Sequence, residues 1–108
     1  MKPIHIALAV TELNASIAEY THRLGVEPVC VVPGRYALWR TAQLNFSINE
    51  KPEIAGQLRH LGFEDPNAPN LTESHDCNGI MWERFTAEQQ RDEIFSYWPN
   101  ADYPESKL

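Results

Sequence analysis

Two hydrophobic periods alternate along the first half of the chain. Residues 4–10 carry isoleucine, leucine or valine at every second position, which is the period of a half-buried strand. From residue 13 to residue 24 the apolar positions recur every three to four residues, with Thr11 as the expected N-cap and Gly25 as the expected stop. The pattern predicts a strand that leads into an amphipathic helix.

Three more strands are expected after this helix. Residues 28–32 are apolar and β-branched, Pro33-Gly34 is a turn sequence, and residues 36–40 alternate again, so the two runs form a hairpin. Residues 44–49 alternate as well, but their second face carries Asn and Ser, as the wall of a water-filled cavity would. The order predicts an α+β fold that begins with a βαβββ unit, whose sheet curls around one helix.

The second half is shorter and less regular. Residues 56–64 predict a fifth strand, and residues 79–85 predict a sixth. Between them, residues 65–78 hold two prolines and several Asn and Asp, so we expect an irregular connection.

A final helix is expected after the sixth strand. Thr86 with Gln89 three residues later is a capping sequence, and Pro99 would stop the helix near residue 98. The polar tail 100–108 is expected to be loosely held.

Composition narrows the class of protein. A chain of 108 residues, 43% hydrophobic, suits one domain, residues 1–108, of a size at which pairing with a second copy helps to bury apolar surface. The net charge of −6 and the nine scattered Lys and Arg argue against nucleic acid as a partner. The chain has neither a signal-like start nor an apolar run long enough for a membrane, so we expect a soluble, cytoplasmic protein. Cys30 and Cys77 form no CxxC motif and are expected to be free thiols.

Three side chains form a candidate metal site. His5 and His60 fall on strand faces that point away from the helix, and Glu83 interrupts an otherwise apolar strand. Two imidazoles and one carboxylate are the ligands of non-haem Fe(II) sites, and they also suit Mn, Ni or Zn. Each residue also has a purely structural interpretation, because a strand histidine is usually hydrogen-bonded in the core and Glu83 beside Arg84 could face solvent. The nearby sequence His75-Asp76-Cys77 lies in a loop and is a weaker candidate.

Four stretches resemble the glyoxalase/bleomycin-resistance/dioxygenase module of the vicinal oxygen chelate superfamily. They are HIALAVTELNASIAEYTHRLGVEPV, RYALWRTAQLNFSINE, QLRHLGFED and NGIMWERF. The pattern is similar to the cadmium-induced and organoarsenical-lyase branch. The resemblance implies His5, His60 and Glu83 as ligands of a divalent metal (Fe, Mn, Ni or Zn), with Glu83 also catalytic.

The chain departs from this family in its second half. Members place a helix and two strands between the HLGF-like strand and the Glu strand, where this chain has only residues 65–78. We therefore expect a core module at about 3–50 and an abbreviated second module at about 56–98, completed by a partner copy in a homodimer. The arsenical branch also uses a vicinal cysteine pair, which the lone Cys77 does not match.

Three functions remain open at this point. The first is a metal-dependent lyase or dioxygenase that acts on a small substrate with vicinal oxygens. The second is a metal-free small-molecule-binding module that uses aromatic contacts such as Trp39 and Trp82, and the third is a structural dimer with an inactive site. The residues nominated for substrate binding are Tyr36, Trp39, Asn45, Ser47 and Arg59.

Overall fold

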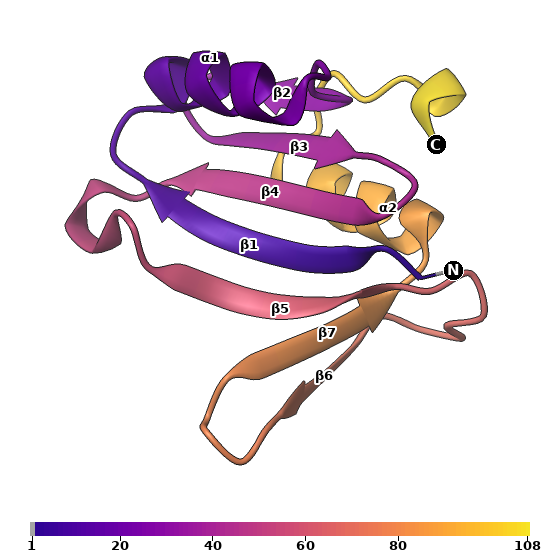
Figure 1. Ribbon diagram of the computed structural model, residues 1–108. Coiled ribbons are helices and arrows are strands. Elements are labelled where there is room, and N and C mark those ends of the chain that lie inside the picture. The colour runs from indigo at the N-terminus through magenta and orange to yellow at the C-terminus, as the bar shows by residue number, and fades with distance from the viewer. Residues whose placement is uncertain (1) are drawn as a thin grey trace.

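The computed structural model describes residues 2–108 as a seven-stranded mixed sheet with one helix on each face (Figure 1). The strand order is β2-β3-β4-β1-β5-β7-β6. The strands are β1 (Ile4–Val10), β2 (Cys30–Val32), β3 (Tyr36–Arg40), β4 (Leu44–Glu50), β5 (Leu58–Glu64), β6 (Thr72–His75) and β7 (Met81–Phe85). The helices are α1 (Leu13–Leu24) and α2 (Ala87–Tyr97), with short 3-10 turns at Pro52–Ile54 and Glu105–Lys107. The predicted α+β class, the βαβββ beginning and the C-terminal helix are confirmed.

The sheet repeats one pairing on each side of its centre. Strand β1 runs parallel to β4 and antiparallel to β5, and β5 runs parallel to β7. The first half thus has its first and last strands side by side, and the second half has the same arrangement in β5 and β7. The connection from β5 to β7 contains β6 and no helix, whereas the connection from β1 to β4 contains α1, β2 and β3.

The two helices cover opposite faces of the sheet, and successive side chains of β3 point alternately to one helix and the other. Ala37 and Trp39 pack with Leu13 of α1, whereas Tyr36 and Leu38 pack with α2. Figure 1 shows α1 in front of the sheet and α2 behind it. The second face, with its polar positions on β4, is the one that bears the candidate site.

The caps of the helices follow local chemistry, with one correction. Helix α2 has the predicted capping box, in which Thr86 and Gln89 each accept from the other's backbone N–H. Helix α1 ends at Gly25 as predicted, in the left-handed conformation. Its N-cap, however, is Glu12 and not Thr11, because the Glu12 carboxylate reaches the N–H of Ala15.

Two segments expected to be irregular are ordered by pairing with distant residues. Strand β6 lies inside the expected loop 65–78, and all four of its residues are exposed, so no apolar alternation marks it. The tail is held on the sheet, since Tyr103 is 2% exposed and its carbonyl accepts from Arg91 Nε, while Asp102 bridges to Val31. Strand β5 begins at Leu58, two residues later than expected.

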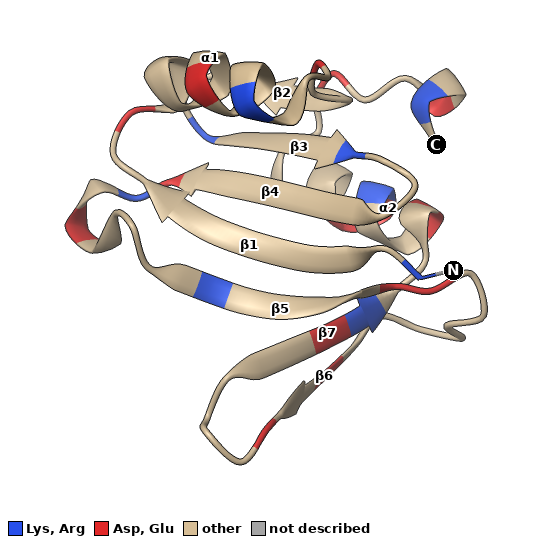
Figure 2. Cartoon of the chain, in the orientation of Figure 1, with Lys and Arg blue, Asp and Glu red and all other residues tan. Residues whose placement is uncertain are grey.

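Charged residues are distributed over the whole described chain. In Figure 2, Lys and Arg lie singly on several elements, interspersed with Asp and Glu. Neither helix within residues 2–108 is long and apolar enough to cross a membrane.

Candidate metal centre

Three neighbouring strands bring His5, His60 and Glu83 together on the face that α2 covers. His5 of β1 lies opposite Gly62 of β5, and Gly62 in turn lies opposite Glu83 of β7. His60 is two residues before Gly62, so its side chain points to the same face. Gly62 leaves the space between His5 and Glu83 free, because a Cβ there would collide with the backbone of Glu83.

The ligand atoms of these residues converge. His60 Nε2 is 2.9 Å from Glu83 Oε1, and His5 Nε2 is 3.0 Å from His60 Nε2 and 3.7 Å from Glu83 Oε1. All three side chains are buried. The structure thus brings together the three residues that the sequence nominates as metal ligands.

The hydrogen bonds of His5 Nδ1 determine the tautomer of the His5 ring. His5 Nδ1 is 2.8 Å from Asn45 Oδ1 and 3.1 Å from the Asn45 carbonyl oxygen. Both partners are acceptors, so Nδ1 carries the proton and Nε2 presents its lone pair toward His60 and Glu83. Such an outer hydrogen bond is the usual orientation device of a metal-ligating histidine.

Asn45 is itself held by a buried polar network. Its amide nitrogen donates to Glu64 Oε1 at 2.9 Å and to Gln90 Oε1 at 2.8 Å, and Gln90 Nε2 donates back to Asn45 Oδ1 at 3.1 Å. Arg40 forms a bidentate pair with Glu64 at 2.8 and 2.9 Å. Through Gln90, helix α2 therefore takes part in orienting His5.

The environment favours the protonation states that a metal requires. Burial, together with the charge of His60, lowers the pKa of His5 and so favours the neutral imidazole. Burial alone would raise the pKa of Glu83, but the hydrogen bond and charge of His60 outweigh it and hold that pKa below its ordinary value. A neutral imidazole and an ionised carboxylate are the ligand forms of these residues.

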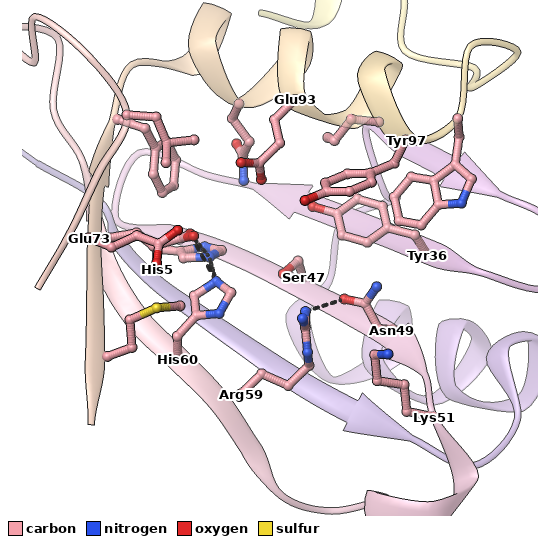
Figure 3. A pocket seen from close by; sticks show the side chains of 17 residues that line it. His5, Tyr36, Ser47, Asn49, Lys51, Arg59, His60, Glu73, Glu93 and Tyr97 are labelled. Atoms are coloured by element: carbon pink, nitrogen blue, oxygen red, sulfur yellow. Dashed lines mark hydrogen bonds and ion pairs between the residues drawn. The ribbon is translucent and has the colours of Figure 1, made fainter. Parts of the chain in front are cut away.

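A cavity of about 390 Å³ opens in front of the three side chains (Figure 3). Its polar wall includes Ser47 and Asn49 from β4 and Arg59 from β5. Its other wall comes from α2, whose contributions are Gln90, Glu93, Ile94 and Tyr97. The site lies between sheet and helix, at the centre of the molecule.

The residues nominated for substrate binding are divided by the structure. Tyr36, Ser47 and Arg59 line the cavity. Asn45 lies behind His5 as its hydrogen-bond partner, and it is not part of the cavity wall. Trp39 was assigned to the wrong face: it is fully buried against α1, because it is three residues from Tyr36 and an odd separation along a strand reverses the face.

Sequence reasoning missed the contribution of α2. Gln90, Glu93, Ile94 and Tyr97 recur at helical spacing, so a polar stripe on one face of this helix was the available signal. The candidate cluster at 75–77 has a structural role, since the Asp76 carboxylate accepts from the N–H groups of Asn78 and Ile80 and from Trp82 Nε1.

Comparisons with known proteins found a partial match to an enzyme and a similar fold. No protein-family model matches the chain. The chain is 42% identical over 67 residues to the trivalent organoarsenical cleaving enzyme of Bacillus sp. (strain MD1), and the match covers 59% of this chain and 41% of that enzyme. Over these 67 residues the chain is homologous to that enzyme. The chain spans about two fifths of the length of the enzyme it matches.

A solved structure has a related fold. The chain superposes on a structure described as NAD-dependent benzaldehyde dehydrogenase from Legionella pneumophila with a TM-score of 0.54, covering 78% of this chain and 98% of that chain. The two are 13% identical, so the similarity concerns the fold alone.

Proposed function

We propose that this protein binds a divalent metal through His5, His60 and Glu83 and acts in the adjoining cavity on a small substrate with vicinal oxygens. The proposal rests on the convergence of two Nε2 atoms and one carboxylate oxygen, all buried. The donor set suits Fe(II), Mn, Ni or Zn.

The number of protons available to the three side chains supports a cation between them. His60 Nε2 lies within 3.0 Å of both Glu83 Oε1 and His5 Nε2. A neutral His60 has at most one proton on this atom, and His5 Nε2 has none, so a single N–H must serve two acceptors. Two buried acceptor atoms that share one proton are a costly arrangement, and a cation relieves it.

When bound, a divalent ion in this site supplies Lewis-acid polarisation of a substrate oxygen. The chain's own residues orient the metal ligands and exclude water from the cavity. Asn45 holds the His5 ring, and the aromatic pair Tyr36 and Trp98, with ring centroids 5.2 Å apart, forms part of the cavity wall. Burial raises the pKa of Tyr36, so its hydroxyl stays protonated and can donate to a bound oxygen.

Helix α2 supplies a carboxyl group to the same cavity. Burial, followed by the charge of Glu83, raises the pKa of Glu93 above its ordinary value. A carboxyl group with a raised pKa in a cavity is suited to accepting and returning a proton. The reaction class, lyase or dioxygenase, is part of the proposal, with Glu93 in place of Glu83 as the group free to transfer protons.

Metal content tests the proposal directly. Native protein, Glu83→Gln and Glu73→Gln are incubated separately with Fe(II), Mn, Ni and Zn, passed through gel filtration and measured by mass spectrometry. We expect about one ion per chain in the native protein and in Glu73→Gln, and loss of the ion in Glu83→Gln. Glu73 is the matched control because it lines the cavity but is not one of the three converging residues. Absence of metal from the native protein would favour the metal-free binding module instead.

The expected homodimer is a further part of the proposal. On the sheet face opposite the cavity, Phe63 stacks on Trp82 with ring centroids 5.9 Å apart, and Phe63 remains 36% exposed. A second copy that packs there would bury this apolar surface, in the part of the sheet where the abbreviated second half has no helix.

A further inference from the structure

We propose that Arg59 and Lys51 form an anion subsite on the Asn49 side of the cavity that His5, His60 and Glu83 also line, and that the substrate carries a carboxylate in addition to its vicinal oxygens. The inference rests on the proposed function and specifies its substrate class.

A bulge in β5 aims Arg59 into the cavity. The pairing of β1 with β5 shifts register after Ala7, so that Ala7 lies opposite His60 but Leu8 lies opposite Leu58. Strict alternation would place Arg59 on the face opposite His60, together with Phe63. Arg59 instead lines the same cavity as His60 (Figure 3). Bulges that redirect a side chain in this way are common beside functional sites.

The Arg59 guanidinium is positioned by a neutral partner. One of its N–H groups donates to Asn49 Oδ1 at 2.8 Å, and Asn49 is 9% exposed. Within residues 2–108, neither Arg59 nor Lys51 takes part in an ion pair, whereas Arg40 and other arginines pair with carboxylates. The charge of Arg59 is therefore held in place without being compensated, and its remaining donors suit a carboxylate.

The charges along the cavity are separated. Figure 3 shows Glu73 near His5 and His60, whereas the Arg59 guanidinium lies between His60 and Asn49, and Lys51 lies next to Asn49. The positive charge of Arg59 lowers the pKa of Glu83 and opposes the rise in the pKa of Glu93, after the larger effects of burial and the nearer groups. An anionic group is consequently favoured at Arg59 and disfavoured near the carboxylates, which orients the substrate in one direction.

Aromatic and apolar side chains of the cavity suit an apolar body. Tyr36, Tyr97 and Trp98 line the cavity together with Ile94 and Phe85. A volume of about 390 Å³ is at the small end of the range for ligand pockets, so the body is about the size of one ring with its substituents. The geometry selects a small molecule with oxygens at one end and a carboxylate at the other.

Two probe ligands of equal size distinguish the contribution of a negative charge to binding from that of the vicinal oxygens. Both 3,4-dihydroxybenzoate and 3,4-dihydroxybenzamide carry vicinal hydroxyls, but only the first is an anion. Their dissociation constants are measured by calorimetry on metal-loaded and metal-free protein, for native protein, Arg59→Gln, Lys51→Gln and the control Arg23→Gln. Arg23 lies on α1 and pairs with Glu19, away from the cavity.

We expect the benzoate to bind native protein and Arg23→Gln roughly tenfold more tightly than the benzamide, a difference of about 1.4 kcal/mol. The preference should disappear in Arg59→Gln, decrease in Lys51→Gln, and weaken as salt is added. Equal affinities for the two probes in native protein, a preference that survives Arg59→Gln, or binding of neither probe would overturn the anion subsite.

Failure of the proposed metal site gives a different result. If metal removal leaves the affinity of the benzamide unchanged, the vicinal hydroxyls do not meet a metal, and the proposed function is wrong. The comparison of benzoate with benzamide still decides the anion subsite in that case, because it depends only on charge.

Discussion

Replacing Asn45 by leucine tests whether an outer hydrogen bond orients the proposed metal ligand His5. Asn45 is fully buried, and its side chain bonds to His5, Glu64 and Gln90. Leucine has a similar volume and no polar atom, so Asn45→Leu removes these bonds without opening a large cavity. Each partner then depends on the contacts that it retains.

The structure sets the expected magnitudes. His5 Nδ1 keeps the carbonyl oxygen of residue 45 as an acceptor at 3.1 Å, so the tautomer survives and only the ring orientation loosens. We therefore expect metal affinity to fall by about tenfold, the lower limit for a residue of this kind. Glu64 keeps Arg40, but Gln90 is 5% exposed and loses both of its hydrogen bonds to residue 45. The unpaired amide should lower the free energy of unfolding of metal-free protein by about 1–3 kcal/mol.

The two quantities are measured separately. Urea unfolding of metal-free protein gives the stability, and competition with a chelator of known affinity gives the metal dissociation constant. The matched control is Gln90→Leu, which loses the contact with α2 but leaves the bond between Asn45 and His5 intact. It should lower stability and reduce metal affinity less than Asn45→Leu does, because its effect on His5 is indirect. The reasoning is refuted if Asn45→Leu binds metal as well as the native protein does, or if Gln90→Leu loses as much affinity.

Three further changes probe the packing, the pH dependence and the assembly. Gly62→Ala should lower the free energy of unfolding by about 1–3 kcal/mol and abolish metal binding, because the added Cβ meets the backbone of Glu83. An unchanged urea midpoint of unfolding would contradict this prediction. Burial alone would raise the pKa of Glu64, but hydrogen bonds from Arg40 and Asn45 lower it below 4.5. The stability that Glu64 contributes is therefore complete above pH 4.5 and is lost as pH falls through the lowered pKa. Glu64→Gln should make the free energy of unfolding fall less steeply with decreasing pH in unfolding curves measured from pH 6 to 2. An equally steep fall would show that other groups cause it. Phe63→Glu should shift the protein from dimer to monomer in sedimentation experiments, and a native protein that is already monomeric would refute the proposed pairing.

Elements with a strong local pattern were predictable. The alternation of β1, β3 and β4 and the capping box of α2 are short-range properties, and the structure retains them. Strand β6 and the packed tail were not predictable in this way. Four exposed polar residues form β6 because the backbone of β7 pairs with them, and Tyr103 is buried because it packs with the core residues Cys30, Tyr36 and Leu38.

The candidate site, too, has features that could be predicted locally and features that depend on distant contacts. Trp39 packs against α1 because it lies on the other face of β3 from Tyr36, and Arg59 lines the cavity because a bulge, invisible in the sequence, redirects it. Glu93 and Gln90 were missed because the sequence does not state which face of the sheet a C-terminal helix will cover.

The sequence by itself determined the kinds of ligand atom and the faces of their strands. Period-two alternation separates His5 from its neighbours Ile4 and Ile6, and this is a local property of the chain. Only the tertiary structure decided that His5 and His60, 55 residues apart, would meet each other and Glu83. The deciding factors are the register of β1, β5 and β7 and the open space at Gly62, which depend on pairing between distant strands and are not encoded in any local period.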